Sequence, residues 1–448
     1  MTGPDPRVTA AAQSSERALA LHPFYRGKIQ TAPKVPIRGL SDFSLWYTPG
    51  VAASCRAIHA APEEVWRHTN RANTIAIISD GTRVLGLGDI GPEAGLPVME
   101  GKALLFKYLG GVDAFPLCLG TRDPDELVRA VTWLQPSIGG VNLEDIAQPK
   151  CFRVLAKLRE TLQIPVWHDD QQGTATVVLA GLLNALAVVG KTLPQVRIAL
   201  IGCGAANVAT YRLLVASGAD PRAMMVCDRG GVLHRGRSDV EQRQDEFREK
   251  WELCQQTNAG QVTGDIAAAL RGSDVCISFA ASGPGVIRPE WIRGMASEAI
   301  VFACANPVPE IWPWEAQEAG ARIVATGRGD FPNQVNNSLG FPAIFRGTLD
   351  VRARGITDGM ALAAARELAA AAGTRLGPER IVPRMDEWEI YPRIAAAVGL
   401  AAQHEGIAGR VVDAEQLRQE AADQIRSARE LTRTLQDTGL IPAPPAGG

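Results

Sequence analysis

The polypeptide is organised around Ile164-Pro165-Val166-Trp167-His168-Asp169-Asp170-Gln171-Gln172-Gly173-Thr174, a short apolar run that ends in two adjacent carboxylates. The earlier stretch Asn142-Leu143-Glu144-Asp145-Ile146 has the same design. Neighbouring side chains on a strand point to opposite faces, so both acids of a pair can serve one site only where the backbone turns. Four converging carboxylates would repel one another without a divalent cation between them, and oxygen ligands select Mg²⁺ or Mn²⁺ over zinc. Two solvated acidic loops are the alternative interpretation.

The segments around these carboxylates alternate between strand and helix patterns. Buried strands are predicted over residues 73–79, 112–117 and 140–143, and helices over residues 123–135 and 149–163. Such alternation predicts a largely parallel sheet with its site at the carboxyl edge. Residues 173–190 are predicted to form a buried helix, because their apolar run is interrupted by Asn184 and is too short to cross a bilayer.

A second unit begins with Arg197-Ile198-Ala199-Leu200-Ile201-Gly202-Cys203-Gly204-Ala205-Ala206-Asn207, a strand that enters a Gly-x-Gly loop and then a helix. The next strand ends at Asp228. This series is the dinucleotide fingerprint, in which the pyrophosphate lies against Gly202, Gly204, Ala205 and Ala206 and the acid binds the adenosine ribose. Asn207 replaces the usual third small residue, and we expect it to crowd the helix against the strand.

The charges near the end of this unit point to two different nucleotides. Asp228 favours NAD, because it would repel a 2′-phosphate, and NAD is the nucleotide that we expect. Arg229, Arg235 and Arg237 favour NADP.

Later strands over residues 274–279, 299–305 and 322–325 each end in a polar or glycine-rich loop, and residues 359–436 are Ala-rich and helical. The predicted fold is therefore α/β: an N-terminal α/β substrate and metal domain, a Rossmann-like doubly wound NAD(P) domain, and a helical C-terminal extension. The predicted boundaries are residues 1–20 for a flexible arm, 21–172 for the first domain, 173–350 for the second, and 351–448 for the helical region with a disordered tail.

Composition excludes several classes of function. The 448-residue chain has a formal net charge of −2 and no block rich in Lys or Arg, so a nucleic-acid partner is not expected. Its eight Cys are spread singly, as in a reduced cytosolic protein. The first twenty residues lack the apolar core of a secretory signal. We therefore expect a cytoplasmic enzyme that does not associate with a membrane.

Two further residues could supply acid–base chemistry. Lys102 is predicted near the start of a helix, where the positive end of the macrodipole disfavours its charged form and suits a general base. A lysine with its ammonium in water is the alternative. Tyr47 immediately precedes the Pro49-Gly50 turn and could act from a rigid backbone, or it could be an ordinary core aromatic residue.

Together these motifs resemble the malic enzyme family, in order from about residue 28 to residue 348. The motifs that carry the resemblance are Tyr47-Thr48-Pro49-Gly50, Gly86-Leu87-Gly88-Asp89, Glu100-Gly101-Lys102, Asn142-Leu143-Glu144-Asp145, His168-Asp169-Asp170-Gln171-Gln172-Gly173-Thr174, Asn306-Pro307 and Gln334-Val335-Asn336-Asn337.

The resemblance implies oxidative decarboxylation of (S)-malate to pyruvate through oxaloacetate, with Mg²⁺ or Mn²⁺ and NAD or NADP, in a homodimer or higher homo-oligomer. It also implies a role for each matching position. These are metal ligation by Glu144, Asp145 and Asp170, general base Lys102, general acid Tyr47, orientation of Lys102 by Asp169, and contacts to substrate or nicotinamide from Arg83, Asn306 and Asn337.

Two rival functions fit the same residues. A lyase on this scaffold would decarboxylate oxaloacetate or convert malate to lactate without net redox. A nucleotide sensor would keep the fold as a binding module without catalysis.

Overall fold

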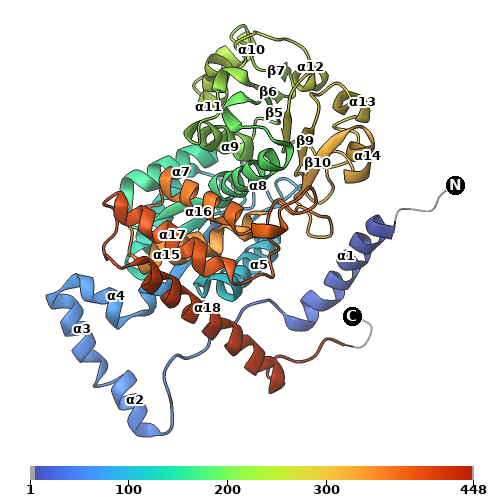
Figure 1. Ribbon diagram of the computed structural model, residues 1–448. Coiled ribbons are helices and arrows are strands. Elements are labelled where there is room, and N and C mark those ends of the chain that lie inside the picture. Colours follow the sequence, from blue (N-terminus) through green and yellow to red (C-terminus); the bar gives the residue numbers. More distant parts are fainter. Residues whose placement is uncertain (1–5, 446–448) are drawn as a thin grey trace.

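The computed structural model describes residues 6–445 of the chain, with two parallel-stranded sheets as its centre (Figure 1). The first sheet has the strand order β2-β1-β3-β4, and every neighbouring pair is parallel. The second has the order β10-β9-β8-β5-β6-β7, in which only the short β7 pairs antiparallel. The expected α/β class is confirmed.

The first sheet consists of buried strands joined by helices, as the alternating pattern predicts. Its elements are β1 (Thr74–Ser79), α5 (Pro92–Gly110), β2 (Asp113–Cys118), α6 (Pro124–Leu134), β3 (Gly140–Leu143), α7 (Lys150–Thr161) and β4 (Val166–His168). The side chains of β1 and β3 are buried along their whole length, which is typical of a parallel sheet covered on both faces. Because all four strands run the same way, Glu144 and Asp169 come out at the same edge.

The second sheet is covered on both faces, and successive side chains of its strand β5 point into two different cores. Ile198 and Leu200 of β5 pack into the large core shared with the first sheet, whereas Ala199 and Ile201 pack into a smaller core on the opposite face. Its elements are β5 (Ile198–Ile201), α9 (Ala205–Ala216), β6 (Met224–Asp228), β7 (Gly231–Val232), α10 (Ser238–Glu241), α11 (Arg248–Gln256), α12 (Ile266–Leu270), β8 (Val275–Ser278), α13 (Pro289–Ile292), β9 (Ala299–Ala303), α14 (Pro313–Glu318) and β10 (Ala321–Thr326).

The two sheets are joined by a long central helix. A π-helical turn, η4 (Asp169–Gly173), continues directly into α8 (Thr174–Val189). The segment Asp169–Val189 is long and apolar enough by composition to cross a membrane, so the expectation that it is too short was wrong. Two thirds of its most apolar window is buried inside the protein, which agrees with the predicted core helix.

The C-terminal helices return to the first sheet instead of forming a separate unit. They are α15 (Phe341–Asp350), α16 (Asp358–Ala370), α17 (Ile390–His404) and α18 (Ala414–Asp437). Phe341 and Phe345 of α15 pack on Phe106 of α5, with ring centroids 4.5 and 5.2 Å apart. The long α18 crosses the same region (Figure 1). Residues more than 200 positions apart therefore support the helix that carries Lys102.

The N-terminal segment extends away from both sheets (Figure 1). It contains α1 (Pro6–Tyr25), α2 (Leu40–Trp46), α3 (Val51–Ala60) and α4 (Val65–His68). The part of residues 1–20 that the structure describes is helical, although a flexible arm was expected; the predicted domain boundaries themselves stay a prediction. Around α2 the large apolar side chains are exposed, among them Leu40, Phe43, Leu45 and Trp46.

Candidate active site

Three carboxylates from two strand ends converge at the edge of the first sheet. Glu144 and Asp145 follow β3, and Asp170 follows β4 within η4. One ligand oxygen from each lies within 4.8 Å of the others. Asp145 has a left-handed backbone (φ 54°), so the chain turns there and both acids of the pair reach one site. The convergence expected from the sequence is thus present in the structure for these three residues.

The electrostatics of this cluster favour a cation. Burial and then the charge of Asp170 raise the pKa of Asp145 to about 8. Burial also raises the pKa of Glu144 and of Asp170. Oδ2 of Asp145 is buried and has no hydrogen-bond partner among the described residues. An all-oxygen donor set with an unpartnered buried oxygen fits a hard divalent ion such as Mg²⁺ or Mn²⁺.

The π-helical turn η4 also contains Asp169, the residue next to the cluster carboxylate Asp170. Single π-helical turns often occur at functional sites, because the wider turn redirects side chains. Gly173 is essential to this turn, since a Cβ there would lie 1.8 Å from Oδ1 of Asp169. The same oxygen accepts a hydrogen bond from Nε1 of Trp167 at 3.0 Å. Asp169 is therefore fixed in one orientation, with its second oxygen free for another partner.

That partner is Lys102. Its Nζ lies 2.6 Å from Oδ2 of Asp169 and 3.0 Å from Oε1 of Glu144, and it lies over the ring of Phe341. The side chain is buried, which excludes the alternative of an ammonium in water. Burial would lower the pKa of Lys102, but the charges of Asp169 and Glu144 raise it above its ordinary value.

The predicted electrostatic role of the helix was wrong. Lys102 lies in the middle of α5, which begins at Pro92 and contains Pro97 within its first turns. The sequence placed the helix start too late because a proline usually marks a first turn. Lys102 is therefore away from the positive end of the macrodipole, and carboxylates control its protonation instead.

A layer of polar residues behind the cluster was not singled out from the sequence. Asp80, at the end of β1, accepts a hydrogen bond from the Thr82 hydroxyl at 2.6 Å and forms an ion pair with Lys150. Oγ1 of Thr82 accepts the backbone N–H of Ala147 at 3.0 Å. Asn142 donates to Oε2 of Glu144 at 2.9 Å. The available signal is the Asp80-Gly81-Thr82 sequence directly after the strand predicted over residues 73–79.

The predicted substrate residues lie at different distances from this centre. The backbone N–H of Arg83 donates to the Asp145 carbonyl at 3.0 Å, and the charge of Arg83 acts on both Asp145 and Asp170. Asn337 begins a short 3₁₀ turn, η7 (Asn337–Leu339), beside Gly173. Tyr47 is different: it follows α2 on the N-terminal segment and is 73% exposed. Within one chain, α2, which Tyr47 follows, lies away from α5, which carries Lys102 (Figure 1).

The glycine-rich loop of the second sheet has the expected geometry. Gly202 has φ 96° and donates its N–H to the Cys227 carbonyl, and a Cβ on Gly202 would lie 2.5 Å from the Phe279 carbonyl oxygen. Gly204 is followed by α9, which starts at Ala205. This arrangement directs the N-terminus of α9 toward the space where the pyrophosphate of a dinucleotide binds.

Asn207 does not simply crowd the helix, as had been expected. Its Nδ2 donates to the carbonyl oxygens of Ile201 and Gly202, both at 2.9 Å. The amide thus satisfies two carbonyls at the end of β5 and ties α9 to the strand. Asn207 therefore stabilises the loop.

Asp228 lies at the end of β6, where the fingerprint predicts it, but both of its carboxylate oxygens accept hydrogen bonds from cationic side chains. Arg237 contacts both oxygens at 3.0 and 3.1 Å, and Lys250 contacts Oδ2 at 3.0 Å. Although burial opposes the change, these partners lower the pKa of Asp228. The residue that favours NAD is thus paired with two cations, and the preference for NAD over NADP stays a prediction.

Asn306 occupies a crowded position between the domains. A Cβ on Gly86, in the first domain, would lie 2.4 Å from the Asn306 carbonyl oxygen, and a Cβ on Gly327 would lie 2.7 Å from its Nδ2. Asn306 follows β9 at the carboxyl edge of the second sheet, where cofactors bind in doubly wound folds. A side chain at Gly86 or Gly327 would collide with Asn306, which explains why both positions are glycine.

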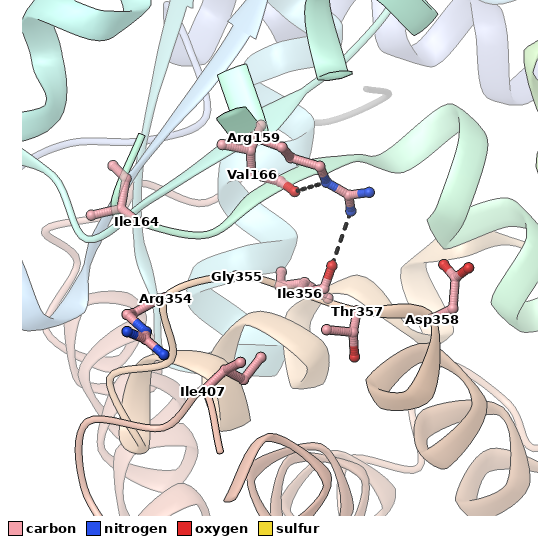
Figure 2. A pocket seen from close by; sticks show the side chains of 9 residues that line it. All are labelled: Arg159, Ile164, Val166, Arg354, Gly355, Ile356, Thr357, Asp358 and Ile407. Atoms are coloured by element: carbon pink, nitrogen blue, oxygen red, sulfur yellow. Dashed lines mark hydrogen bonds between the residues drawn. The ribbon is translucent and has the colours of Figure 1, made fainter. Parts of the chain in front are cut away.

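A cavity of about 400 Å³ lies away from these residues (Figure 2). Arg159 forms one wall, where its guanidinium donates to the carbonyls of Val166 and Ile356. The loop from Arg354 to Asp358 and Ile407 form the opposite wall. None of the lining residues is a carboxylate of the cluster or part of the glycine-rich loop, so this cavity is separate from the candidate site.

The fold and the site together define a two-domain, nucleotide-binding enzyme scaffold, and comparison with known proteins gives its family. Residues 26–159 match the malic enzyme N-terminal domain, and residues 171–403 match the malic enzyme NAD binding domain. The chain belongs to the malic enzyme family.

Characterised relatives and solved structures agree with this assignment. The chain is 46% identical to the NAD-dependent malic enzyme of Geobacillus stearothermophilus, over 88% of this chain and 80% of that protein. It is 44% identical to the bifunctional malic/malolactic enzyme of Bacillus subtilis, over 90% and 96%. The malic enzyme structure from Entamoeba histolytica superposes with a TM-score of 0.94 at 47% identity, covering 99% of this chain and 93% of that one.

Proposed function

We propose that this protein catalyses divalent-metal-dependent oxidative decarboxylation of (S)-malate to pyruvate and CO₂ with reduction of NAD(P)⁺. The observation that supports this most directly is Lys102, buried between Asp169 and Glu144 at the edge of the three-carboxylate cluster. A buried amine beside a cation site is suited to removing a proton from an alcohol whose oxygen the cation binds.

The side chains of this chain account for the proton transfers. Lys102 accepts the proton of the C2 hydroxyl. A bound NAD(P)⁺ would accept the C2 hydride, which would leave oxaloacetate. The C3–C4 bond then breaks, CO₂ leaves, and Tyr47 donates a proton to C3 to give pyruvate. A divalent cation held by Glu144, Asp145 and Asp170 would polarise the C2 oxygen and offset the carboxylate charge that keeps Lys102 protonated.

The remaining predicted residues bind and orient. Asp169 holds Lys102 through the 2.6 Å hydrogen bond, while Trp167 and Gly173 fix the carboxylate. The guanidinium of Arg83 supplies a positive charge for a substrate carboxylate, and the amides of Asn306 and Asn337 contact substrate or nicotinamide from the second domain. Gly202, Gly204, Ala205 and Ala206 receive the pyrophosphate at the N-terminus of α9.

This mechanism requires a tyrosine that one chain does not deliver to the site. The segment that carries Tyr47 also exposes Leu40, Phe43, Leu45 and Trp46, and exposed apolar patches of this kind mark interaction surfaces. The protein therefore functions as a homodimer in which α2 of one copy covers the cleft of the other and supplies Tyr47. Isologous dimers bury the same patch on both copies and complete both sites at once.

The direct test is to incubate the protein with (S)-malate, Mn²⁺ and either NAD⁺ or NADP⁺ while measuring reduced nucleotide and pyruvate. Equal amounts of the two products are expected. Lys102→Ala should lower kcat at least about a hundredfold, because positioned acid–base groups contribute about 10²–10⁴. Lys157→Ala, which alters an exposed lysine of α7, serves as the control. Conversion of malate without net reduction would instead identify a lyase, and no reaction with either nucleotide would identify a sensor.

A further inference from the structure

Glu310 is a buried carboxylate that the proposed reaction does not use. It lies between β9 and α14 and is fully buried. Its Oε1 accepts the Ser278 hydroxyl at 2.7 Å and the Ala280 N–H at 2.9 Å, and its Oε2 accepts the Ala305 N–H at 3.0 Å. Burial raises the pKa of Glu310, while these neutral donors act in the opposite direction. A buried carboxyl group whose hydrogen-bond partners are all neutral is costly to desolvate, so its placement needs a reason.

The three donors belong to two different loops. Ser278 ends β8 and Ala280 follows it, whereas Ala305 follows β9, the neighbouring strand. The backbone extends the same connection, because the Glu310 carbonyl accepts the N–H groups of Gly285 and Ile287 at 3.1 and 3.2 Å. Glu310 therefore joins the loops that leave β8 and β9, and Val308 adds hydrogen bonds to Ser282 and Gly283 farther along the same two loops.

This junction adjoins Asn306, the residue that the proposed function assigns to contact with substrate or nicotinamide. Ala305 directly precedes Asn306, whose carbonyl packs against Gly86 of the first domain and whose amide packs against Gly327. A displacement of Ala305 would move Asn306 against both glycines, where there is little spare room. The Glu310–Ala305 hydrogen bond therefore restrains the residue that directly precedes Asn306.

We propose that Glu310 is a positioning residue for the nicotinamide end of the dinucleotide site, holding the β8 and β9 loops together so that Asn306 is placed correctly in the cleft. A carboxylate suits this position because it can accept at both oxygens, where the Ala280 and Ala305 N–H groups can only donate and the Ser278 hydroxyl donates as well. A glutamine of the same shape would direct its NH₂ group at the donors of one loop and lose that connection. The proposal rests on the proposed function for the identity of the reaction, but not for dinucleotide binding.

The test compares Glu310→Gln with Glu290→Gln, which alters an exposed glutamate of the same domain. Dissociation constants are measured for the reduced dinucleotide by fluorescence titration and for Mn²⁺ by calorimetry, with Tm as the measure of folding. Glu310→Gln should weaken dinucleotide binding about tenfold, consistent with the loss of buried hydrogen bonds, and leave Mn²⁺ binding within about twofold. Glu290→Gln should change neither constant.

Two results would overturn the proposal. One is a lowered Tm with an unchanged dinucleotide dissociation constant, which would make Glu310 a structural residue only. The other is wild-type dinucleotide affinity in Ser278→Ala, a second variant that is available if Glu310→Gln fails to fold. Ser278→Ala removes one of the three hydrogen bonds to Glu310, so it should weaken dinucleotide binding about threefold. A wild-type protein that binds the dinucleotide but does not oxidise malate would refute the proposed function and leave this inference standing.

Discussion

The ammonium of Lys102 and the carboxylate of Asp169 meet at 2.6 Å, although the two residues are 67 positions apart. Lys102 comes from the middle of α5 and Asp169 from the π-helical turn after β4. Both are buried, so the pair is isolated from water and its charges act strongly on each other. This contact joins the proposed acid–base group to the carboxylate cluster.

Removing the carboxylate of this pair should change both rate and pH dependence. Asp169→Asn leaves the shape but removes the charge that raises the pKa of Lys102. The pKa of Lys102 should therefore fall, and the rise of kcat with pH, which reports the neutral base, should move to lower pH. We expect kcat at the optimum to fall about a hundredfold because the amine is no longer oriented. A pH profile of kcat for both proteins checks this, and a shift to higher pH would contradict it.

Metal binding should depend on pH through Asp145. Its pKa is raised to about 8 without a cation, so at lower pH a proton must leave before the carboxylate can act as a ligand. Mn²⁺ affinity should therefore increase with pH up to about 8, by at most about tenfold per pH unit for one proton. Calorimetric titrations at several pH values measure this, and affinity that is flat below pH 8 would contradict a protonated Asp145 in the metal-free protein.

The same site should stabilise the fold when it is filled. Mn²⁺ at about 100 times its dissociation constant should add about 2.7 kcal/mol to the free energy of unfolding, and a chelator should remove that increment. Asp170→Asn should abolish the Mn²⁺-dependent rise in Tm, because the cluster loses one of its three ligands. Asp89→Asn, at an exposed aspartate paired with Arg122, should keep the full rise.

The backbone at Gly173 should tolerate no side chain. A Cβ there would lie 1.8 Å from Oδ1 of Asp169, so Gly173→Ala should displace that carboxylate, destabilise the protein by about 2 kcal/mol and lower kcat. Gly101→Ala is the matched control, because nothing lies within 4 Å of its Cβ position in α5. It should stabilise the helix by about 0.5–1 kcal/mol. Thermal unfolding of the two variants should thus change in opposite directions.

Mixed dimers test whether Tyr47 acts in the partner's site. Lys102→Ala and Tyr47→Phe subunits are each expected to form inactive homodimers. If Tyr47 crosses to the other copy, a heterodimer of the two variants contains one fully wild-type site. An equal mixture that exchanges at random should then recover about one quarter of wild-type activity, because half of the dimers are heterodimers with one working site of two. No recovery in a mixture shown to exchange would place Tyr47 and Lys102 of the same chain in one site.

Much of the fold was predictable because its signals are local. The apolar runs at residues 73–79 and 140–143 are flanked by turn residues, and they form β1 and β3 with shifts of at most one residue. The Gly-x-Gly loop between β5 and α9 was identifiable because only glycine permits the close approach of Gly202 to the Phe279 carbonyl. The start of α5 was misplaced because two prolines, Pro92 and Pro97, each resembled a first turn.

The sequence by itself determined which residue types stand at the ends of the strands, and so predicted converging carboxylates and the glycine-rich nucleotide loop. The choice of Glu144, Asp145 and Asp170 as the metal ligands came from the family resemblance. Only the tertiary structure decided how those residues are used. It showed that Asp169 pairs with Lys102 and that Arg237 and Lys250 form ion pairs with Asp228. It also showed that Tyr47 is exposed on the N-terminal segment. The physical reason is that hydrophobic periodicity and turn chemistry act over a few residues, whereas these contacts depend on how distant elements pack together.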